Sequence, residues 1–480
     1  MKLGALLEGV TLLAGELDRD MEISGVSYDT RSLTPGALFV ALSGYKTDGH
    51  RFIAEALQKG AAAVLCQRPP CEDGPWLTVP DTRAALAQVS AAWFGHPAEN
   101  LTILGVTGTN GKTTTTYLLK EVLERTLDAK VGLIGTNQNM IGQEALPAHR
   151  TTPESYEVQR LLRDMADGGC THVVMEVSSH ALVLRRVDEI TFAAGVFTNL
   201  TQDHLDFHGT MEAYRSAKGL LLAKSRVAVL NLDDGAGRYY AETAPCKTFT
   251  YSENKDAADL TAKNLRLFPT RVEFEAVTMS GISRVKLPIP GGFSVYNALA
   301  TIAACLVLGI PLGEIAAALA GARGVKGRIE VVPVPAEFTV IIDYAHTPDA
   351  LENILTTVRD FTAGRVICLF GCGGDRDRSK RAVMGGIGLD LADLVVVTSD
   401  NPRTERPEEI IADILTGVGE SKTPYEVIPD RRAAIRYALS AARPGDTVVL
   451  AGKGHETYQE IGTVQYPLDE REEIGQFFKG

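Results

Sequence analysis

The feature that most restricts the fold of this chain is an apolar run that leads directly into a glycine-rich loop. The run LTILGV, residues 101–106, is followed by Gly108-Thr109-Asn110-Gly111-Lys112-Thr113 and then by a segment compatible with a helix. Glycines let backbone N–H groups approach phosphate oxygens, and a helix N-terminus adds partial positive charge. Lys112 can reach the β and γ phosphates, and the Thr113 hydroxyl suits Mg²⁺. The segment therefore predicts a strand, loop and helix that bind ATP or GTP.

The spacing of this loop departs from the general G-x-x-x-x-G-K-[ST] pattern. Val106 stands five positions before Gly111, with Gly105 and Gly108 on either side. An ordinary glycine turn that caps a helix is the alternative interpretation.

The arrangement of apolar run and polar turn recurs along the chain, in THVVMEVSSH, FAAGVFTNLTQDH and RVAVLNLDD, and again from residue 331 in FTVIIDYAHTPDA. Helix-compatible segments lie between the runs, which predicts parallel α/β sheets whose ligands bind beyond the carboxyl ends of the strands. We expect three α/β domains. They are a small N-terminal domain (1–99), a central P-loop mononucleotide-binding domain with a parallel sheet (100–330), and a C-terminal Rossmann-like domain (331–480).

The composition disfavours several classes of protein. The 480 residues, 45% of them hydrophobic, suffice for several globular cores. A net charge of -12 disfavours nucleic acid or acidic membranes as partners bound by bulk electrostatics. Glu8 and Glu16 interrupt the apolar start, which favours an amphipathic helix over a signal peptide, and no stretch approaches a membrane span. Seven cysteines without C-x-x-C spacing favour reduced thiols, so we expect a cytoplasmic protein.

Two polar residues at predicted strand ends have the chemistry of metal ligands. Glu176 ends the run THVVMEV, and His204 follows the next run, in TQDHLDFH. Taken singly, each is more readily explained as a structural residue. Because phosphoryl transfer needs cations that neutralise the phosphate, the glycine-rich loop in the same sheet favours a shared metal ion.

The form T-G-T-N-G-K-T is narrower than a general phosphate loop, and it resembles the Mur ligase and folylpolyglutamate synthetase superfamily. Further motifs match the MurE branch of that family in order over the whole chain: D-T-R, T-T-P, E-V-S-S-H-A-L, T-N-L-T-Q-D-H-L-D-F-H, D-Y-A-H-T-P-D, D-N-P-R and G-K-G-H-E. The resemblance implies an ATP-dependent amide ligase that adds meso-2,6-diaminopimelate to UDP-MurNAc-L-Ala-D-Glu through an acyl phosphate, in cytoplasmic peptidoglycan precursor synthesis.

The resemblance also assigns residues to ATP and Mg²⁺. Lys218 matches the lysine that members of the family carry as a carbamate able to hold a second Mg²⁺, a role that requires a depressed pKa in a partly buried site. Lys224 is the competing lysine. The catalytic residues implied are Lys112, Glu176, His204 and Lys218, and the metal ligands are Thr113, Glu176, His204 and carbamylated Lys218. The ATP-binding residues implied are Gly108, Thr109, Asn110, Gly111, Lys112, Thr113, Thr114, Asn297, Arg328 and Asp343.

Residues that match the family's site for the UDP-MurNAc-dipeptide lie in the first two predicted domains. They are Tyr28, Thr30, Gly44, Tyr45, Lys46, Thr151, Thr152, Ser179 and Arg186, with Asp29 beside them. Thr30 replaces the usual Ser and keeps the hydroxyl. Leu184 stands where Gln is common, which leaves one polar contact to the dipeptide unaccounted for.

The C-terminal segment carries the residues that the resemblance assigns to the incoming amino acid. They are Arg381, Asp400, Asn401, Pro402, Arg403, Gly452 and Glu456. The planar guanidinium of Arg403 can bind the distal carboxylate of diaminopimelate, while Asp400 and Glu456 can accept from its ammonium group. Lysine lacks that carboxylate, so D-N-P-R predicts the amino acid. In isolation the string fits a β-turn with a solvent-facing arginine.

Two other functions stay open at this point. Another ligase of the superfamily would add L-lysine or D-Ala-D-Ala, or extend folate with glutamate, and E-V-S-S-H-A-L and D-N-P-R argue against each. A nucleotide-binding scaffold without ligase chemistry would lack the metal and amine-site residues, whereas this sequence has them. We expect a monomer with small-molecule substrates, no nucleic-acid partner and no membrane span.

Overall fold

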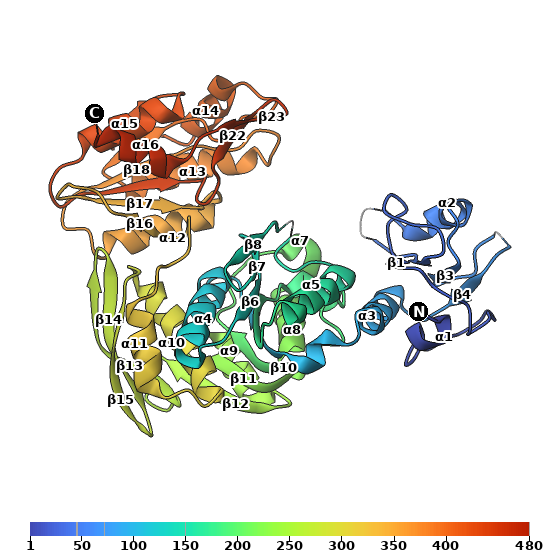
Figure 1. The fold of residues 1–480 in the computed structure, drawn as a ribbon. Helices are drawn as coiled ribbons and strands as arrows, with labels where there is room; N and C mark the ends of the chain where they lie inside the picture. Colours follow the sequence, from blue (N-terminus) through green and yellow to red (C-terminus); the bar gives the residue numbers. More distant parts are fainter. Residues whose placement is uncertain (45–46, 72, 149, 480) are drawn as a thin grey trace. The chain divides into compact units, whose positions relative to one another are not determined.

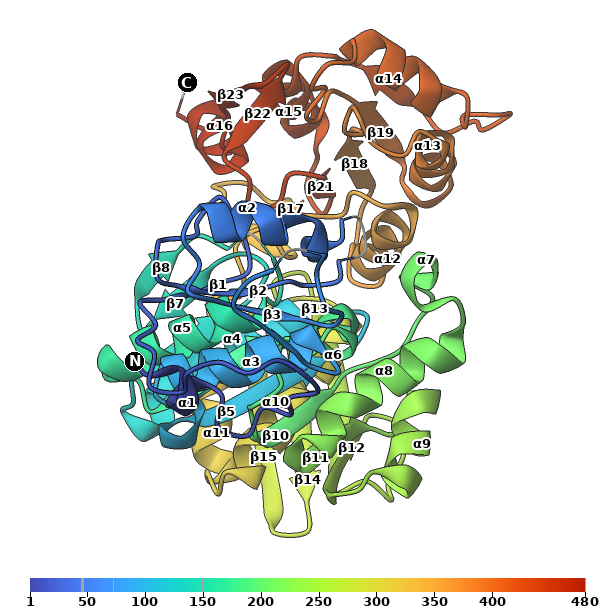
Figure 2. The same cartoon turned by 90° about the vertical axis from the view of Figure 1, so that its right-hand side faces the viewer.

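The computed structural model describes residues 1–44, 47–71, 73–148 and 150–479. The chain forms two compact units, which are Met1–Asp259 with Ala300–Pro311 and Leu260–Leu299 with Leu312–Gly480. Figures 1 and 2 show the elements of each unit. Every helix in the described part of the chain is too short or too polar to span a membrane.

The first unit begins with a four-stranded parallel sheet in the order β1-β2-β3-β4. Leucine and valine side chains of these strands share a core with α1 and α3. Asp81 caps α3 by accepting from the N–H groups of Arg83 and Ala84. The elements are α1 (Leu3–Leu6), β1 (Val26–Ser27), β2 (Leu38–Val40), η1 (Gly49–Phe52), α2 (Ile53–Gln58), β3 (Ala63–Cys66), β4 (Trp76–Thr78), α3 (Thr82–Trp93) and η2 (Pro97–Asn100).

The helix predicted at the N-terminus is much shorter than expected, since α1 covers only Leu3–Leu6. Gly9 has a φ of +80°, a left-handed conformation that favours glycine and ends the helical path. The N–H of Leu13 then donates to the carbonyl of Thr78 at 2.8 Å. Pairing with β4 therefore takes the place of the remaining helical turns.

Eight strands of an 11-stranded sheet lie in this unit, in the order β12-β11-β10-β5-β9-β6-β7-β8. The strands from β12 to β6 are parallel, and β7 and β8 continue the sheet antiparallel. The predicted strands are β5, β9, β10 and β11, with helices between them, so the parallel α/β arrangement is confirmed. The elements are β5 (Thr102–Thr107), α4 (Lys112–Leu127), β6 (Val131–Ile134), β7 (Asn139–Ile141), β8 (Glu144–Leu146), α5 (Ser155–Asp167), β9 (His172–Glu176), α6 (Ser179–Val183), β10 (Phe192–Phe197), α7 (Leu205–His208), α8 (Met211–Ala223), β11 (Ser225–Asn231), α9 (Gly235–Thr243) and β12 (Lys247–Ser252).

The second unit contains a six-stranded sheet in the order β16-β17-β21-β18-β19-β20, parallel except for β16. Helices α12, α13 and α14 cover one face, and α15 and α16 cover the other. This doubly wound arrangement confirms the Rossmann-like expectation. The elements are β16 (Glu330–Val332), β17 (Thr339–Asp343), α12 (Pro348–Arg359), β18 (Val366–Phe370), α13 (Ser379–Leu391), β19 (Leu394–Val397), α14 (Pro407–Leu415), β20 (Tyr425–Val427), α15 (Arg431–Ala441), β21 (Thr447–Ala451), β22 (Tyr458–Ile461), β23 (Val464–Pro467) and α16 (Glu470–Phe477).

Three antiparallel strands at one end of the 11-stranded sheet, which the sequence did not predict, precede this domain, and β15 packs against α11. The strands and their neighbours are β13 (Leu260–Phe268), β14 (Arg271–Thr278), β15 (Gly281–Leu287), α10 (Gly292–Val307) and α11 (Leu312–Ala320). The predicted domain boundaries near residues 99 and 330 stay predictions.

A buried ion pair ties two strands of the six-stranded sheet together. Arg431 and Glu470 are both 0% exposed and lie 2.8 Å apart. The Arg431 guanidinium also donates to the carbonyls of Ser399, after β19, and of Ala451, which ends β21. Removing one partner of a buried pair leaves the other charge in the core without compensation. Each residue of the pair is therefore stable in the core only while the other compensates its charge.

We expect Arg431→Met to lower the free energy of unfolding by about 3–5 kcal/mol in urea denaturation. The double variant Arg431→Met with Glu470→Leu should regain most of this loss, because no buried charge is left. Arg436→Met is the control, since Arg436 is 57% exposed and lies 3.6 Å from Glu473. An equal loss in the single and double variants would contradict the explanation.

Candidate active site

The glycine-rich loop between β5 and α4 requires glycine at two positions. Gly108 has a φ of +151°, and a Cβ atom there would lie 1.8 Å from the Thr198 hydroxyl oxygen. Gly111 has a φ of +84° and stands immediately before the first residue of α4. Both conformations are unfavourable for other residues. The loop is therefore a tight turn onto a helix N-terminus, which is the geometry of a phosphate site.

The segment that follows β10 holds this loop in shape. The Thr198 hydroxyl donates to the Asn110 carbonyl at 2.6 Å, and the Asn199 side chain accepts from the Asn110 N–H at 2.8 Å. The Lys112 ammonium donates to the loop carbonyls of Gly108 and Thr109 at 2.9 and 2.8 Å. The cation predicted to contact phosphate thus lies against the loop itself.

Glu176 joins the loop to two neighbouring segments. Its carboxylate is buried and accepts from the Thr113 hydroxyl at 3.1 Å and from the N–H and hydroxyl of Thr136 at 2.9 and 3.0 Å. The Thr152 hydroxyl donates to the Glu176 carbonyl at 2.8 Å. A Cβ at Gly135 would lie 2.6 Å from this carboxylate. The predicted Thr113, Glu176 and Thr152 are therefore brought together, and Thr136, two residues after β6, joins them although no sequence motif indicated it.

Lys218 is buried in α8, with 1% of its surface exposed. Burial, followed by the charge of Lys112, holds the pKa of Lys218 well below its ordinary value. Its ammonium nitrogen lies 4.3 Å from the centroid of the Tyr214 ring. The competing Lys224 is instead ion-paired with Asp188 at 2.7 Å. The depressed pKa expected for Lys218 is confirmed, and its carbamylation stays a prediction.

His204 lies among aromatic rings at the start of α7. Its side chain is 47% exposed and lies 3.3 Å from Asp203, with the His180 ring 4.9 Å away. His208 contacts the Ser179 hydroxyl at 2.9 Å, and burial together with the charges of His180 and Lys218 lowers its pKa to about 4. The described residues include no group of three or more His, Cys, Asp or Glu side chains arranged around a metal position.

The oxygen atoms around Glu176 nevertheless have the chemistry of a Mg²⁺ site. The hydroxyl of Thr113 and the carboxylate of Glu176 are hard oxygen donors, which Mg²⁺ prefers, and they lie beside the phosphate loop. Mg²⁺ keeps several waters and needs few protein ligands, so this donor set fits the ion.

Residues predicted to bind the UDP-MurNAc-dipeptide cluster around Glu154 and Glu157. Tyr28 donates to Glu157 at 3.0 Å, and burial is the main reason why the pKa of Tyr28 is raised. Arg186 donates to the Thr152 carbonyl at 3.1 Å and pairs with Glu154 at 2.9 Å. Glu154, the residue after T-T-P, was not assigned by any motif.

The other residues predicted for this substrate are more dispersed. Thr30 is buried, and its carbonyl accepts from Lys59 at 2.9 Å. A Cβ at Gly44 would lie 2.4 Å from the Thr47 carbonyl, so the turn requires glycine. Thr151 is linked to Glu176 through the Thr136 hydroxyl. Tyr45 and Lys46 lie outside the described residues.

The second unit holds three of the residues predicted to contact ATP. Asp343, at the end of β17, is buried and accepts from the N–H groups of Ile329 and Ala345 at 2.8 and 2.9 Å, and burial raises its pKa. Arg328 lies over the Tyr344 ring at 5.1 Å. Asn297 is buried in α10. These contacts leave the predicted roles untested.

The residues predicted to bind diaminopimelate converge at the carboxyl ends of β19 and β21. Asp400 and Asn401 are buried, and the Asn401 amide donates to Glu456 at 2.9 Å. Gly452 has a φ of +113°, and a Cβ there would lie 2.6 Å from the Asp400 carboxylate. Two strand ends far apart in the sequence thus form one polar cluster, as expected for a ligand site in a parallel sheet.

The two arginines of this region have different surroundings. Arg403 has a φ of +49°, donates to Glu460 and to the Gly374 carbonyl at 2.8 Å each, and is 20% exposed. Arg381 is fully buried and pairs with Glu405 and Asp413 at 2.8 Å. The guanidinium of Arg381 is thus engaged with carboxylates of the chain itself, and its assignment to diaminopimelate stays a prediction.

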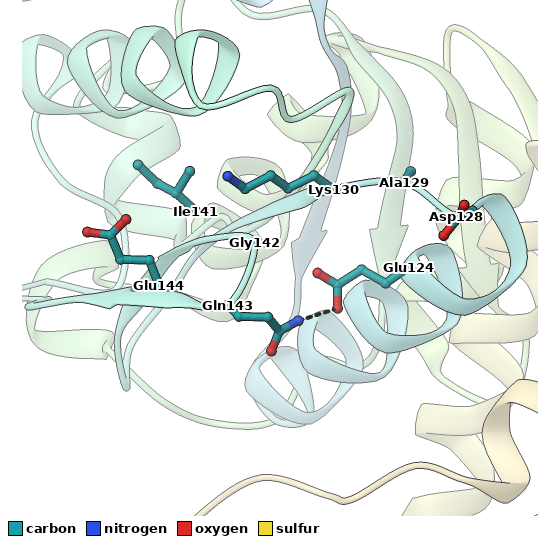
Figure 3. Close-up of a pocket in the computed structure, with 8 residues that line it drawn as sticks. All are labelled: Glu124, Asp128, Ala129, Lys130, Ile141, Gly142, Gln143 and Glu144. Carbon is teal, nitrogen blue, oxygen red and sulfur yellow. Dashed lines mark hydrogen bonds between the residues drawn. The ribbon is translucent and has the colours of Figure 1, made fainter.

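A cavity of about 570 Å³ lies apart from these clusters, between the end of α4 and the β7–β8 hairpin (Figure 3). Gln143 donates to Glu124 at 3.1 Å across it. The lining residues are Glu124, Asp128, Ala129, Lys130, Ile141, Gly142, Gln143 and Glu144. None of the predicted site residues is among them.

Comparisons with known proteins find similarity along most of the chain. Residues 22–126 match the Mur ligase family, catalytic domain; residues 106–305 match the Mur ligase middle domain; and residues 327–454 match the Mur ligase, glutamate ligase domain. The chain is 47% identical to the UDP-N-acetylmuramoyl-L-alanyl-D-glutamate–2,6-diaminopimelate ligase of Alkaliphilus metalliredigens, over 96% of this chain and 94% of that protein. The ligase of the same name from Caldanaerobacter subterraneus subsp. tengcongensis is 48% identical over 98% of each chain.

Solved structures give the same result. A structure of a UDP-N-acetylmuramoyl-L-alanyl-D-glutamate–2,6-diaminopimelate ligase has a TM-score of 0.76 and 34% identity, and the match covers 100% of this chain and 99% of that one. MurF from Acinetobacter baumannii, at 20% identity and a TM-score of 0.65, shares the fold. Taken with the matched domains, these similarities show that the chain belongs to the Mur ligase family.

Proposed function

We propose that this chain is an ATP-dependent ligase that joins meso-diaminopimelate to UDP-MurNAc-L-Ala-D-Glu in peptidoglycan precursor synthesis. Relatives that carry this name are 44–48% identical over nearly the whole chain. The observation that carries the choice of amino acid is the cluster of Asp400, Asn401, Arg403 and Glu456 that follows β19 and β21, the two strands on either side of β18. A guanidinium and carboxylates in one cluster suit a ligand that carries both a carboxylate and an ammonium group.

In the proposed reaction, the loop from Gly108 to Thr113 binds the ATP phosphates through its backbone N–H groups, and Lys112 turns from the loop carbonyls toward them. A γ-carboxylate oxygen of D-Glu attacks the γ-phosphorus, the bond to the bridging oxygen breaks, and ADP leaves. The amine of diaminopimelate then attacks the acyl carbon, and the tetrahedral intermediate loses phosphate and a proton to give the amide.

Mg²⁺ would be held by Thr113 and Glu176, with His204 and a carbamate on Lys218 as further ligands. When bound, the ion neutralises charge on the phosphoryl oxygens. Glu176 holds Thr113 and Thr136 beside the loop through hydrogen bonds to its carboxylate. Lys218 lies in a site that favours its neutral amine, and a neutral amine is the form that reacts with CO₂.

The domain division at residues 99 and 330 is part of the proposal. The first domain would bind the uridine nucleotide, the central domain ATP, and the last domain the amino acid. The substrates are small molecules, and we place the reaction in the cytoplasm with the protein as a monomer.

The direct test gives the purified protein ATP, Mg²⁺ and UDP-MurNAc-L-Ala-D-Glu, with either meso-diaminopimelate or L-lysine, and measures phosphate release and product mass. We expect the tripeptide mass with diaminopimelate. Arg403→Met should lower kcat/KM for diaminopimelate by roughly 30-fold to several thousand-fold, because the ligand's distal carboxylate loses its partner. The KM for ATP should not change.

Arg406→Met is the matched control, since Arg406 is 74% exposed and lies 3.8 Å from Glu408. Preference of the wild type for lysine would keep the ligase but reject the role of Arg403. Absence of product with either amine would favour a scaffold or another branch of the family.

A further inference from the structure

A buried lysine lies at the centre of the cluster proposed to bind the amino acid. Lys453, the second residue of G-K-G-H-E, is 0% exposed. An ammonium group is costly to remove from water unless it is paired and hydrogen-bonded. The position of Lys453 therefore depends on the groups that surround it.

Those groups are the residues already proposed to contact diaminopimelate. The Lys453 ammonium donates to the Asn401 amide oxygen at 2.8 Å and to a Glu456 carboxylate oxygen at 3.2 Å, and it lies 3.9 Å from Asp400. The Asn401 amide nitrogen donates to the same Glu456 oxygen at 2.9 Å. Lys453, Asn401 and Glu456 thus form a closed triangle of hydrogen bonds.

This triangle fixes the orientation of the Asn401 amide. Its oxygen accepts both from Lys453 and from the N–H of Glu460 at 2.9 Å, so the amide nitrogen must face Glu456. Without Lys453, the amide loses one of the two donors to its oxygen and Glu456 loses its cation. Asn401 would then be held only by the Glu460 N–H and by Glu456, so both side chains would be less firmly oriented within the site.

The charges of the cluster also suit an incoming ammonium group. Asp400 and Glu456 supply two negative charges and Lys453 one positive charge, which leaves a single negative charge. The other nearby cation, Arg403, is paired with Glu460 at 2.8 Å. One ammonium group of the ligand would balance the remaining charge.

We propose that Lys453 is a positioning residue of the amino-acid site, which holds Asn401 and Glu456 in the arrangement that receives the ammonium group of the amino-acid substrate. It acts through these two side chains and does not touch the reacting atoms. The inference rests on the proposed function.

The test compares wild type with Lys453→Met, which keeps the length of the side chain and removes its charge. The KM for diaminopimelate should rise on the order of 10- to 100-fold, because Asn401 and Glu456 each lose a hydrogen bond to a charged group. The KM values for ATP and UDP-MurNAc-L-Ala-D-Glu should stay within about twofold. Lys422→Met, at an exposed lysine of the same unit, is the control and should change none of the three.

A second variant separates positioning from folding. In Lys453→Ala, added propylammonium should lower the raised KM for diaminopimelate, whereas 1-propanol, which lacks the charge, should not. An unchanged KM for diaminopimelate in folded Lys453→Met, a parallel rise in all three KM values, or equal rescue by both additives would overturn the proposal. Absence of product from wild type would instead reject the proposed function, before any variant is compared.

Discussion

Lys218→Met is expected to lower kcat by about 10²- to 10³-fold while the melting temperature at pH 7.5 stays the same or rises. The loss of rate follows if Lys218 supplies a charge that stabilises the transferring phosphoryl group. The gain in stability follows because the ammonium of Lys218 is buried, which disfavours its charged form, and methionine fills the same space without a charge.

The pH dependence of stability gives Lys218 an independent signature. Its pKa is lower in the folded state than in the unfolded state, so between the two values the unfolded chain binds the extra proton. Stability therefore rises with pH through this window in wild type, and Lys218→Met should lose that part of the slope. Thermal unfolding between pH 7 and 10 measures the difference.

Lys224→Met is the matched control for both measurements, because Lys224 follows the same helix but is paired with Asp188. It should keep kcat within a few-fold of wild type. Retention of activity by Lys218→Met, or a loss of rate accompanied by a collapse in stability, would contradict the role assigned to Lys218.

The sheets could be predicted because local sequence determines buried parallel strands. Runs such as LTILGV and FAAGVF are mainly apolar and are followed by polar residues, and both form strands with loops at their carboxyl ends. The phosphate loop could also be predicted from the sequence, since Gly108 and Gly111 adopt conformations that other residues avoid. For the buried strands and the phosphate loop, the local sequence was enough to predict the structure.

Contacts between segments far apart in the chain could not be predicted from the local sequence. Arg381 follows a glycine-rich turn and looks available for a ligand, but Glu405 and Asp413 enclose it from another part of the chain. Lys218 resembles any helical lysine, and only the packing of α8 shows that it is buried. Lys453 lies in a recognised motif, yet its contact with Asn401 depends on β19 and β21, two strands that only the folded sheet brings to either side of β18.

Glu176→Gln should lower kcat by about 10²- to 10³-fold and raise the Mg²⁺ concentration needed for half-maximal activity. Glu176 is buried and accepts three hydrogen bonds from Thr113 and Thr136. Glutamine keeps the size of the side chain but removes the negative charge, so the proposed metal ligand loses its charge. Rates measured over a range of Mg²⁺ concentrations, at saturating ATP, separate this effect from a defect in nucleotide binding.

Thr136→Val distinguishes the charge of Glu176 from its role as a hydrogen-bonded link. This variant removes the Thr136 hydroxyl, which donates to the carboxylate at 3.0 Å, but leaves the negative charge in place. If the carboxylate acts through the metal, Thr136→Val should change the Mg²⁺ dependence far less than Glu176→Gln does. If Glu176 only joins the loop to its neighbours, both variants should lower the melting temperature and neither should shift the Mg²⁺ requirement. The two variants therefore separate a metal ligand from a structural contact at one buried carboxylate.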